Sequence, residues 1–133
     1  EPDEFLDIFS EFNIAVVADD LAQESRQFRT DVPSGIDPLE QLAQQWQDFD
    51  GCPLALNEDK PRGQMLIDMT KKYNADAVVI CMMRFCDPEE FDYPIYKPEF
   101  EAAGVRYTVL DLDIESPSLE QLRTRIQAFS EIL

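Results

Sequence analysis

Short continuous apolar runs alternate along this chain with segments whose apolar residues recur at helical spacing, and this alternation constrains the fold most strongly. The apolar runs predict β-strands at 14–18, 77–82 and 105–112, because such runs are typical of strands buried on both faces. The amphipathic segments predict helices. These helices are expected at 2–12, 38–48, 62–74, 87–103 and 118–133, with the fourth interrupted at Pro94 and Pro98.

The order of these elements predicts an α/β fold. Strands that alternate with helices are joined by right-handed crossovers, which indicates a three-layer, mostly parallel, doubly wound sheet of the flavodoxin or Rossmann type, with helices on both faces. A length of 133 residues fits a single domain. Doubly wound domains usually open with a strand, whereas this chain opens with a helix. We therefore expect the first strand of the sheet to be missing from residues 1–133.

Acidic residues outnumber basic residues by 28 to 11, and the chain contains no histidine. A net charge of −17 repels phosphate backbones and anionic lipid surfaces, so we expect neither nucleic-acid nor membrane binding. No apolar run is long enough to span a bilayer, and the acidic start does not resemble a signal peptide. The lack of histidine excludes a Ser-His-Asp triad and an imidazole metal site. Three cysteines in so acidic a chain indicate a reducing, cytoplasmic setting.

Polar residues follow each predicted strand, at the edge where open parallel sheets bind their ligands. They are Asp19 and Asp20, residues 84–87 and residues 111–116. The paired acids suggest a Mg²⁺ site or a phosphoacceptor like that of receiver domains, but Lys97 is not placed for the lysine that such a site needs. We favour the alternative that these acids end strands and cap helices. Glycine-rich phosphate loops are absent, so the sequence gives no support for nucleotide binding.

The most informative motif is RFCDPEEF, in which Cys86 follows a predicted strand and precedes a predicted helix. Asp87 is expected to cap that helix, with Pro88 at its first position and Glu90 completing a capping box. A thiol at a helix N-terminus is stabilised as thiolate, the form that acts as a nucleophile or a metal ligand. Arg84 adds positive charge there. The alternative is an inert, partly buried cysteine in a capped loop.

The other two cysteines are less informative. Cys81 and Cys86 have the C-x4-C spacing that opens a plant-type ferredoxin pattern, but Glu89 stands where the next cysteine is needed. Cys81 lies within an apolar run and is expected to pack in the core, as is Trp46 on its amphipathic helix. Cys52 lies in a loop, in the tripeptide GCP. Three cysteines exclude a four-cysteine cluster held by this chain alone, but one or two ligands of a shared cluster remain possible.

Five stretches stand out in order along nearly the whole chain. They are VVADD followed by Arg26, DPLEQLA, ADAVVICMMRFCDPEEFDYP, EAAG before VRYTVLDLD, and QLRTRIQAF. Together they resemble the C-terminal domain of 2-hydroxyacyl-CoA dehydratase subunits, a family that includes benzoyl-CoA reductase subunits. FCDP combined with QLRTRIQAF is specific, whereas either motif alone is weak. Full subunits of this family are much longer, so the resemblance implies that residues 1–133 form the C-terminal domain of a longer subunit.

The resemblance implies an iron–sulfur enzyme. Such subunits pair into heterodimers with a sister subunit, and each can carry a [4Fe–4S] cluster held by three cysteines. An ATP-hydrolysing iron–sulfur activator protein delivers one electron at low potential. The dehydratases then remove water from an (R)-2-hydroxyacyl-CoA through a ketyl radical, whereas the reductases dearomatise an aryl-CoA. By itself, the 133-residue chain is expected to hold no cluster and to show no turnover.

The resemblance also implies roles for particular residues. The cysteine of FCDP is a cluster ligand in the family and corresponds to Cys86, and Cys52 is a second candidate because relatives often carry Cys-Pro in that loop. The remaining ligands come from outside this chain. Candidate substrate-binding residues are Arg84 and, in the QLRTR motif, Arg123 and Arg125. The chain departs from the family at Ala22, where many relatives have a cysteine.

A hypothesis of another class is a non-catalytic, acidic α/β interaction domain that binds a basic partner or a sister subunit. The enzyme hypothesis requires Cys86 to face the carboxyl edge of the sheet, whereas the interaction hypothesis does not.

Overall fold

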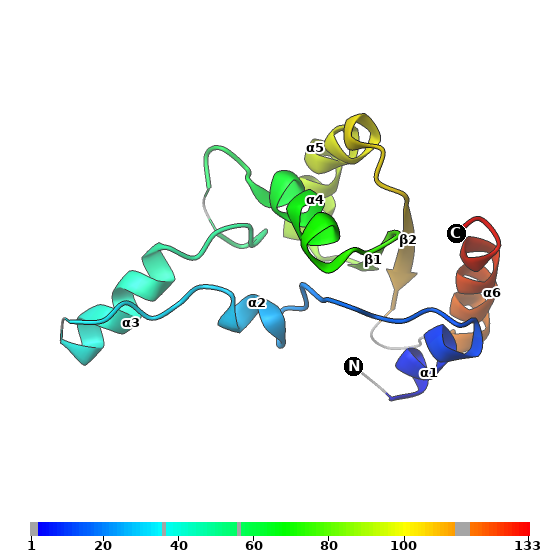
Figure 1. Ribbon diagram of the computed structural model, residues 1–133, viewed down its shortest axis with the longest axis horizontal. Coiled ribbons are helices and arrows are strands. Elements are labelled where there is room, and N and C mark those ends of the chain that lie inside the picture. The colour runs from blue at the N-terminus through cyan, green and yellow to red at the C-terminus, as the bar shows by residue number, and fades with distance from the viewer. Residues whose placement is uncertain (1–2, 36, 56, 114–117) are drawn as a thin grey trace.

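A computed structural model describes residues 3–35, 37–55, 57–113 and 118–133 of the chain. Two parallel strands lie among helices that cover both of their faces (Figure 1). The elements in chain order are α1 (Asp3–Glu11), α2 (Ser25–Phe28), α3 (Pro38–Gln47), α4 (Arg62–Tyr73), β1 (Val78–Met83), α5 (Asp87–Ala103), β2 (Tyr107–Leu112) and α6 (Leu119–Ser130). This order confirms the α/β prediction and every long helix expected from the sequence.

Strands β1 and β2 form a parallel pair, in which Val78 lies opposite Tyr107 and Met83 lies opposite Leu112. Helix α5 makes the crossover between them, as the alternating pattern predicts. The two strands confirm the predictions at 77–82 and 105–112. In the part of the chain that the structure describes, the sheet consists of these two strands.

The predicted strand at 14–18 is wrong for this structure. Residues 14–20 have no regular secondary structure, and Val16 and Val17 are 57% and 51% exposed. Only the start of the run contributes to the core, where Ile14 packs against the residues between α1 and α6. An apolar run forms a strand only when a neighbouring strand satisfies its backbone groups, and β1 pairs only with β2 among the described residues.

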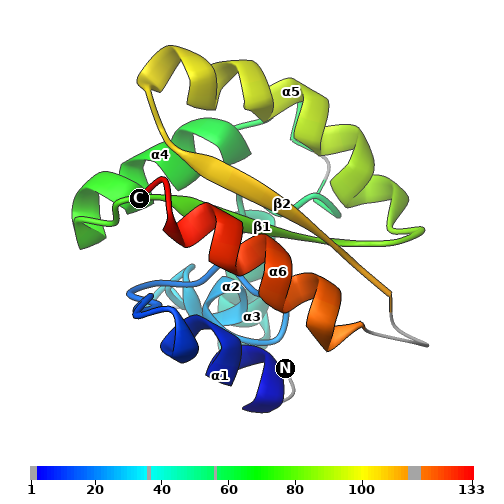
Figure 2. The ribbon, with the colours of Figure 1, turned by 90° about the vertical axis from the view of Figure 1, so that its right-hand side faces the viewer.

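The core is divided into two apolar clusters, one on each face of the sheet. The first joins Leu110 and Leu112 of β2 to α1 and α6, and the second joins Ile80 and Met82 of β1 to α4 and α5. Alternate residues of a strand point to opposite faces, so both strands contribute to both clusters. Figure 2 shows α1 and α6 on one side of the strands and α4 and α5 on the other. Cys81 packs against the first cluster, which confirms its predicted place in the core.

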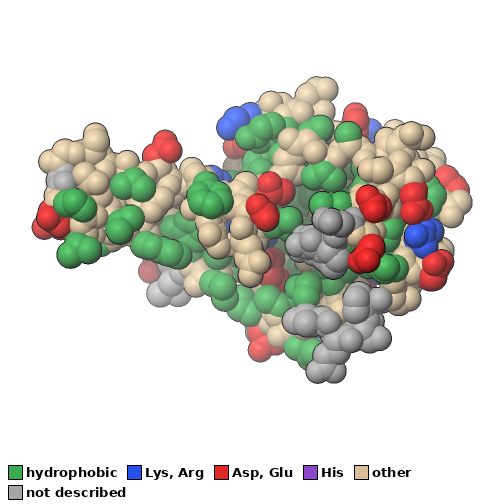
Figure 3. Space-filling model, turned by 90° about the horizontal axis from the view of Figure 1, so that it is seen from below, with side chains coloured by type: hydrophobic (Ala, Val, Ile, Leu, Met, Phe, Trp, Pro, Cys, Tyr) green, Lys and Arg blue, Asp and Glu red, His purple; other side chains and the backbone are tan. Residues whose placement is uncertain are grey.

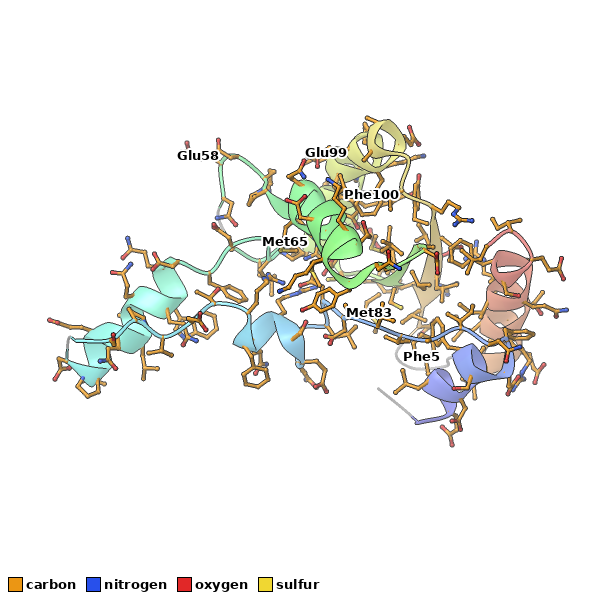
Figure 4. All side chains as sticks on the ribbon, in the orientation of Figure 1. Phe5, Glu58, Met65, Met83, Glu99 and Phe100 are labelled. Atoms are coloured by element: carbon orange, nitrogen blue, oxygen red, sulfur yellow. The ribbon has the colours of Figure 1, made fainter. Side chains whose placement is uncertain are left out.

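Phe5 and Phe100 mark the two clusters in Figure 4. Phe100 is completely buried among the aromatic rings of α5 and β2, with its centroid 5.6 Å from that of Tyr107. On the other face, Phe5 lies edge-on to Phe9 at 5.4 Å between centroids. Helix α1 is therefore held by apolar packing although the chain around it is acidic.

Three helix ends carry residues that are typical of caps, whereas the start of α5 differs from the sequence prediction. Asp37 accepts a hydrogen bond from the Leu39 N–H at 2.9 Å, Ser118 accepts one from Gln121, and Gly104 ends α5 with a φ of 68°. In α5, by contrast, Cys86 occupies the N-cap position and Asp87 is the first helical residue, so the predicted Asp87 cap is wrong.

Helix α5 runs without interruption through both of its internal prolines, contrary to the expected break. Pro94 and Pro98 are exposed, as is Glu90, one turn before Pro94. The carbonyl groups that lose an N–H donor at each proline can therefore bind water. An exposed helix face tolerates proline at lower cost than a buried one for this reason.

Helix α3 extends away from the rest of the molecule and contains no buried residue (Figure 1). Trp46 is 72% exposed, so the prediction that it packs in the core is wrong. Its ring lies 5.5 Å from that of Phe49, measured between centroids. Hydrophobic side chains lie over this projecting part of the surface in Figure 3. Across the ranges that the structure describes, no helix is long and apolar enough to cross a membrane.

Candidate functional site

The candidate site lies where β1 ends and α5 begins. Cys86 follows the exposed Phe85, whose φ of 65° turns the backbone sharply between the strand and the helix. The Cys86 N–H donates to the Met83 carbonyl at 3.1 Å, and the Cys86 carbonyl accepts from Glu90 at 3.0 Å. The thiol is partly exposed at the N-terminus of the 17-residue α5. The amide dipoles of a helix N-terminus favour an anionic ligand at this position, whereas Asp87, Glu89 and Glu90 in the first turn oppose it.

Cys52, the second candidate ligand, is buried in the loop between α3 and α4. Its carbonyl accepts a hydrogen bond from Ala55 at 2.9 Å, and Gly51 before it has a φ of 70°. Gly51 is also tightly packed, because an added Cβ atom would lie 2.5 Å from the Met65 sulfur. The loop that carries Cys52 therefore has little freedom to move.

Two arginines and two carboxylates form a closed set of ion pairs near these cysteines, which we call the arginine–carboxylate ring. Arg26 lies 3.2 Å from both Asp20 and Glu89. Arg62 lies 2.6 Å from Asp20 and 3.3 Å from Glu89. Arg29 also pairs with Asp20, from outside the ring. The ring joins α2, α4 and α5 through side chains far apart in sequence.

The ring is buried, and its charges stabilise one another. Burial lowers the pKa of the Arg26 guanidinium, but the carboxylates of Asp20 and Glu89 outweigh this effect and raise that pKa above its ordinary value. The Cys52 sulfur acts in the same direction and so lies within electrostatic reach of Arg26. Burial also raises the pKa of the Tyr96 hydroxyl to about 12, which keeps Tyr96 neutral beside Arg62.

The acidic residues at the strand ends are used in caps and ion pairs, as the favoured alternative predicts. Asp19 accepts hydrogen bonds from the N–H groups of Leu21 and Ser25 at 3.1 and 3.0 Å. Asp111 pairs with Arg125. In the described parts of the chain, no three Cys, Asp or Glu side chains converge to hold a metal ion. Of the predicted polar group 111–116, residues 114–116 lie outside the described residues.

The three candidate substrate-binding arginines lie in different surroundings. Arg84, just after β1, is half exposed and pairs with Asp113 at 3.2 Å across a small cavity of about 70 Å³. Arg125 lies 3.3 Å from Asp111 of β2. Arg123 instead binds Glu11 of α1 at 2.8 Å, so it ties two helices together on one face of the sheet. Arg84 is thus the one of the three that immediately adjoins the Cys86 segment.

A larger hollow of about 360 Å³ opens beside the Cys52 loop. Its lining includes Arg29, Gly51, Gln64 and Met65. Because Arg29 is a member of the same charged cluster as the ring, this hollow and the ring adjoin one another.

Sequence reasoning identified Cys86 and Cys52 as candidates but did not identify the arginine–carboxylate ring. Arg26 entered only as part of a motif, and Arg62 stands at the first position of α4 with no distinguishing signal. Glu89 was considered only because it stands where a ferredoxin-type pattern would need a cysteine. Ion pairs that join residues 42 and 63 positions apart leave no local periodicity. The sequence showed only that Arg62 is a charged residue at the start of an amphipathic helix.

The residues present fit a negatively charged cofactor held partly from outside this chain. Two thiols, Cys52 and Cys86, provide soft ligands of the type that iron–sulfur clusters use. In addition, the Nε atoms of Arg26 and Arg62 are buried and have no hydrogen-bond partner in the part of the chain that the structure describes. Buried N–H donors without acceptors are rare in folded proteins, and they suit a site that receives an anionic group.

Comparison with known proteins shows that the whole chain matches one family. The family described as "2-hydroxyglutaryl-CoA dehydratase, D-component" matches residues 1–133. The chain is 54% identical over 134 residues to the lactoyl-CoA dehydratase subunit beta of Anaerotignum propionicum, and this alignment covers 100% of the chain and 36% of that protein.

Two further relatives have the same relation to the chain. The (R)-phenyllactyl-CoA dehydratase beta subunit of Clostridium sporogenes is 43% identical over 133 residues, covering 100% of the chain and 35% of that subunit. The (R)-2-hydroxyglutaryl-CoA dehydratase subunit beta of Acidaminococcus fermentans is 32% identical over 124 residues, covering 90% of the chain and 33% of that subunit. The chain thus spans about a third of the length of the curated relatives it matches.

Proposed function

The chain belongs to the family of the 2-hydroxyglutaryl-CoA dehydratase D-component, and from this membership we propose that it forms part of the beta subunit of a 2-hydroxyacyl-CoA dehydratase. The observation that carries the proposal is the similarity of the chain, along all or nearly all of its length, to three beta subunits that are each named as dehydratases. The substrates in those three names are all CoA thioesters of 2-hydroxy acids. This agreement is also why we propose dehydration rather than reduction of an aryl-CoA.

The proposed reaction removes water from an (R)-2-hydroxyacyl-CoA. One electron enters the thioester carbonyl and gives a ketyl radical, from which the C2 hydroxyl leaves as hydroxide. Loss of a proton from C3 and return of the electron then give an enoyl-CoA, so the overall reaction has no net redox change. The cofactor that we propose, a [4Fe–4S] cluster, supplies single-electron chemistry at low potential when it is bound.

Cys86 is the residue of this chain that we propose as a ligand of the cluster. Its position at the N-terminus of α5 supports this role, because backbone N–H groups stabilise anionic sulfur there. We propose Cys52 as a second candidate, supported by its fixed loop and its nearness to Arg26. Because no set of three ligands converges in the described parts of this chain, the remaining ligands would come from elsewhere in the subunit.

Arg84, Arg123 and Arg125 are proposed to bind the phosphates or the acyl group of the CoA substrate. Arg84 has the strongest support, because it lies beside the Cys86 segment and because its ion pair with Asp113 is partly exposed to solvent. The ion pairs that Arg123 makes with Glu11 and Glu120 give it a structural alternative role.

We also propose that β1 and β2 belong to a larger doubly wound sheet in a longer subunit, of which residues 1–133 form the C-terminal domain. Parallel sheets normally have more than two strands and are covered on both faces, as these strands already are. The exposed Val16 and Val17 also resemble a strand that lacks its neighbour. Restoring upstream residues is expected to raise the melting temperature, and an unchanged value would count against this proposal.

The proposed partners are a sister subunit, an ATP-dependent iron–sulfur activator protein and an acyl-CoA, in the cytoplasm. The name "beta subunit" in the relatives supports the first of these. A second candidate function, a non-catalytic interaction domain, is favoured by one observation: the exposed apolar face of α3, which nothing in the described structure covers.

Anaerobic iron and sulfide analysis of the full subunit pair, with an absorption spectrum, tests the proposal. Cys86→Ser is expected to lose or alter the iron–sulfur absorbance. Cys81→Ser is the matched control, because Cys81 packs against the apolar core and is expected to leave the spectrum unchanged. An unaltered spectrum in Cys86→Ser would contradict the ligand assignment. Failure of the reconstituted wild type to bind iron would favour the interaction-domain hypothesis.

A further inference from the structure

The arginine–carboxylate ring is buried to a degree that structural ion pairs rarely reach. The side chains of Arg26, Arg62 and Asp20 are only 8%, 9% and 8% exposed, and that of Glu89 is 18% exposed. Removing charged groups from water is costly, and their mutual attraction offsets that cost only when pairing and hydrogen bonding are complete. In this ring, the pairing is complete for the carboxylates but not for the arginines.

The cluster has one positive charge in excess. Among the described residues, Arg26, Arg62 and the adjoining Arg29 form ion pairs with two carboxylates, Asp20 and Glu89. The buried Nε atoms of Arg26 and Arg62 also have no acceptor within the described ranges. The ring itself is neutral, and the additional charge comes from Arg29 at its edge, whose side chain is 23% exposed. This additional charge and the two unpaired N–H donors are independent features, and both would be satisfied by an anionic group.

The ring is connected to both cysteine-bearing segments. Arg62 donates from Nη1 to the Gly51 carbonyl at 2.8 Å, directly before Cys52. At the other end, Glu89 belongs to the first turn of α5, which begins after Cys86. The ring therefore fixes the Cys52 loop relative to the start of α5, through hydrogen bonds that an isolated helix or loop does not have.

Arg29 strengthens the same connection. It pairs with Asp20 and donates from Nη2 to the Asp50 carbonyl at 2.7 Å, one residue before Gly51. Two successive carbonyls of the Cys52 loop thus accept hydrogen bonds from arginines of one cluster. The same loop also carries Lys60, which pairs with Asp92 of α5 at 2.8 Å, so a second ion pair ties it to that helix.

We propose that Arg26 and Arg62 are positioning residues for the anionic group held at Cys86 and Cys52. In this role Arg62 fixes the loop of Cys52, and the excess positive charge around Arg26 stabilises the more negative, reduced state of the group. This inference rests on the proposed function, because it takes that group to be an iron–sulfur cluster. It assigns a task to side chains that neither bind the metal nor contact the substrate.

If the ring acts through its charge, substitutions of opposite charge should shift the midpoint potential of the cluster in opposite directions. A purely structural role does not predict this difference. Arg26→Gln removes one positive charge, so reduction of the cluster becomes harder and the midpoint potential becomes more negative. Glu89→Gln removes one negative charge, so the potential becomes more positive. We expect each change to alter the reduction equilibrium about tenfold, equivalent to about 59 mV for one electron.

The experiment is a redox titration of the reconstituted full subunit pair, followed by electron paramagnetic resonance, with iron content measured on each sample. Arg106→Gln is the matched control, because Arg106 binds the carbonyls of Ile132 and Leu133 at the opposite end of β2. It is expected to leave the potential unchanged. Arg62→Lys, which keeps the charge but loses the planar fork, is expected to lower iron content and to shift the potential little.

Each outcome decides between the alternatives. Shifts of opposite sign in Arg26→Gln and Glu89→Gln support the proposal. Equal or absent shifts in folded, iron-containing variants overturn it while leaving the cluster assignment intact. If Arg26→Gln does not fold, Arg29→Gln removes one charge at a side chain that is 23% exposed, and the same negative shift is expected. A wild type that binds no iron overturns the proposed function itself.

Discussion

The two faces of the sheet are held by apolar contacts, whereas residues 19–55 are joined to α4 and α5 through a buried cluster of charged groups. Helices α1 and α6 cover one face and α4 and α5 the other, through clusters centred on completely buried side chains such as Ile126 and Phe100. Neither α2 nor α3 packs extensively against another element. Arg26 and Arg29 provide much of the attachment of this segment.

The apolar layers therefore provide most of the stability of the fold, whereas the charged region is available for function. Apolar layers tolerate changes of pH and salt, because their stability depends on area removed from water. Buried ion pairs depend on complete pairing, so a change at one member affects all the others. The ring occupies the carboxyl edge of the sheet, where ligands of such folds bind.

The largest expected effect lies in the apolar layers. Phe100→Ala removes a completely buried ring from the cluster of α4, α5 and the sheet, and we expect the free energy of unfolding to fall by about 3–5 kcal/mol. Urea denaturation measures the change. Phe91→Ala is the control on the same helix, because Phe91 is 75% exposed and its loss should have little effect. Equal losses in the two variants would contradict the assignment of the core.

The next effect tests whether the ring holds residues 19–55. Asp20→Asn removes the one carboxylate that pairs with Arg26, Arg29 and Arg62, and leaves three cations without their shared partner. We expect a loss of about 3 kcal/mol, since breaking a buried pair leaves an uncompensated charge. Asp31→Asn, at an exposed position on the same segment, is the control. If the free energy of unfolding fell by less than about 0.5 kcal/mol, the usual range for surface substitutions, the ring would not stabilise the fold.

The contrast between the regions also explains which features the sequence predicted. The layered core could be predicted because each element carries its own pattern. For example, the apolar stripe of α6 contains Leu122, Ile126 and Phe129, and all three are buried. The parallel pairing of β1 with β2 followed from the alternation of elements. Caps at Asp37 and Ser118 were also local signals.

The features that could not be predicted depend on partners far away in sequence or outside the chain. The pattern at 14–18 is that of a strand, but it lacks a neighbouring strand among the described residues. Trp46 lies on an amphipathic helix in which no residue is buried by the described parts of the chain. The ring needs Glu89, Arg62 and Arg26 together, and no single stretch of sequence contains more than one of them.

A third prediction concerns the contact between α4 and α5, inside the apolar region. Gly63 is buried, and an added Cβ atom would lie 2.7 Å from the Tyr96 Cβ, closer than real contacts allow. Gly63→Ala should therefore separate the two helices and cost about 1–3 kcal/mol, despite the higher helix propensity of alanine. Thermal denaturation measures it, with Gln64→Ala on the exposed side as control. A stabilised Gly63→Ala variant would contradict the close approach.

A fourth prediction uses pH to examine the charged region. Burial raises the pKa of the Asp19 carboxyl, but hydrogen bonds from Leu21 and Ser25 outweigh it and hold that pKa below its ordinary 3.8. A lowered folded-state pKa contributes stability that is complete above the unfolded-state pKa, and this contribution is lost as the pH falls through the folded-state value. Stability should therefore decline as the pH falls below 3.8.

The test of this pH dependence is a series of melting temperatures across that range for the wild type and for Asp19→Asn. The variant keeps an oxygen acceptor for the N–H groups but cannot titrate, so its curve should be flatter than that of the wild type. Asp7→Asn is the control, as an exposed carboxylate on α1. Parallel curves for the wild type and Asp19→Asn would show that other carboxylates determine the acid sensitivity.

The smallest effect is expected on α3, where the comparison of the two regions is sharpest. Leu39 is 77% exposed, so Leu39→Ala should change the free energy of unfolding of the chain by no more than about 0.5 kcal/mol. Trp46, the only tryptophan of the chain, reports the surroundings of the same helix. Its fluorescence should have the wavelength of a solvated indole and should be readily quenched by acrylamide. A loss above about 1 kcal/mol, or a shielded Trp46, would mean that α3 packs on the sheet layers in solution. Residues 19–55 would then be attached by apolar contacts as well. The proposed function of the ring would be limited to positioning the cluster.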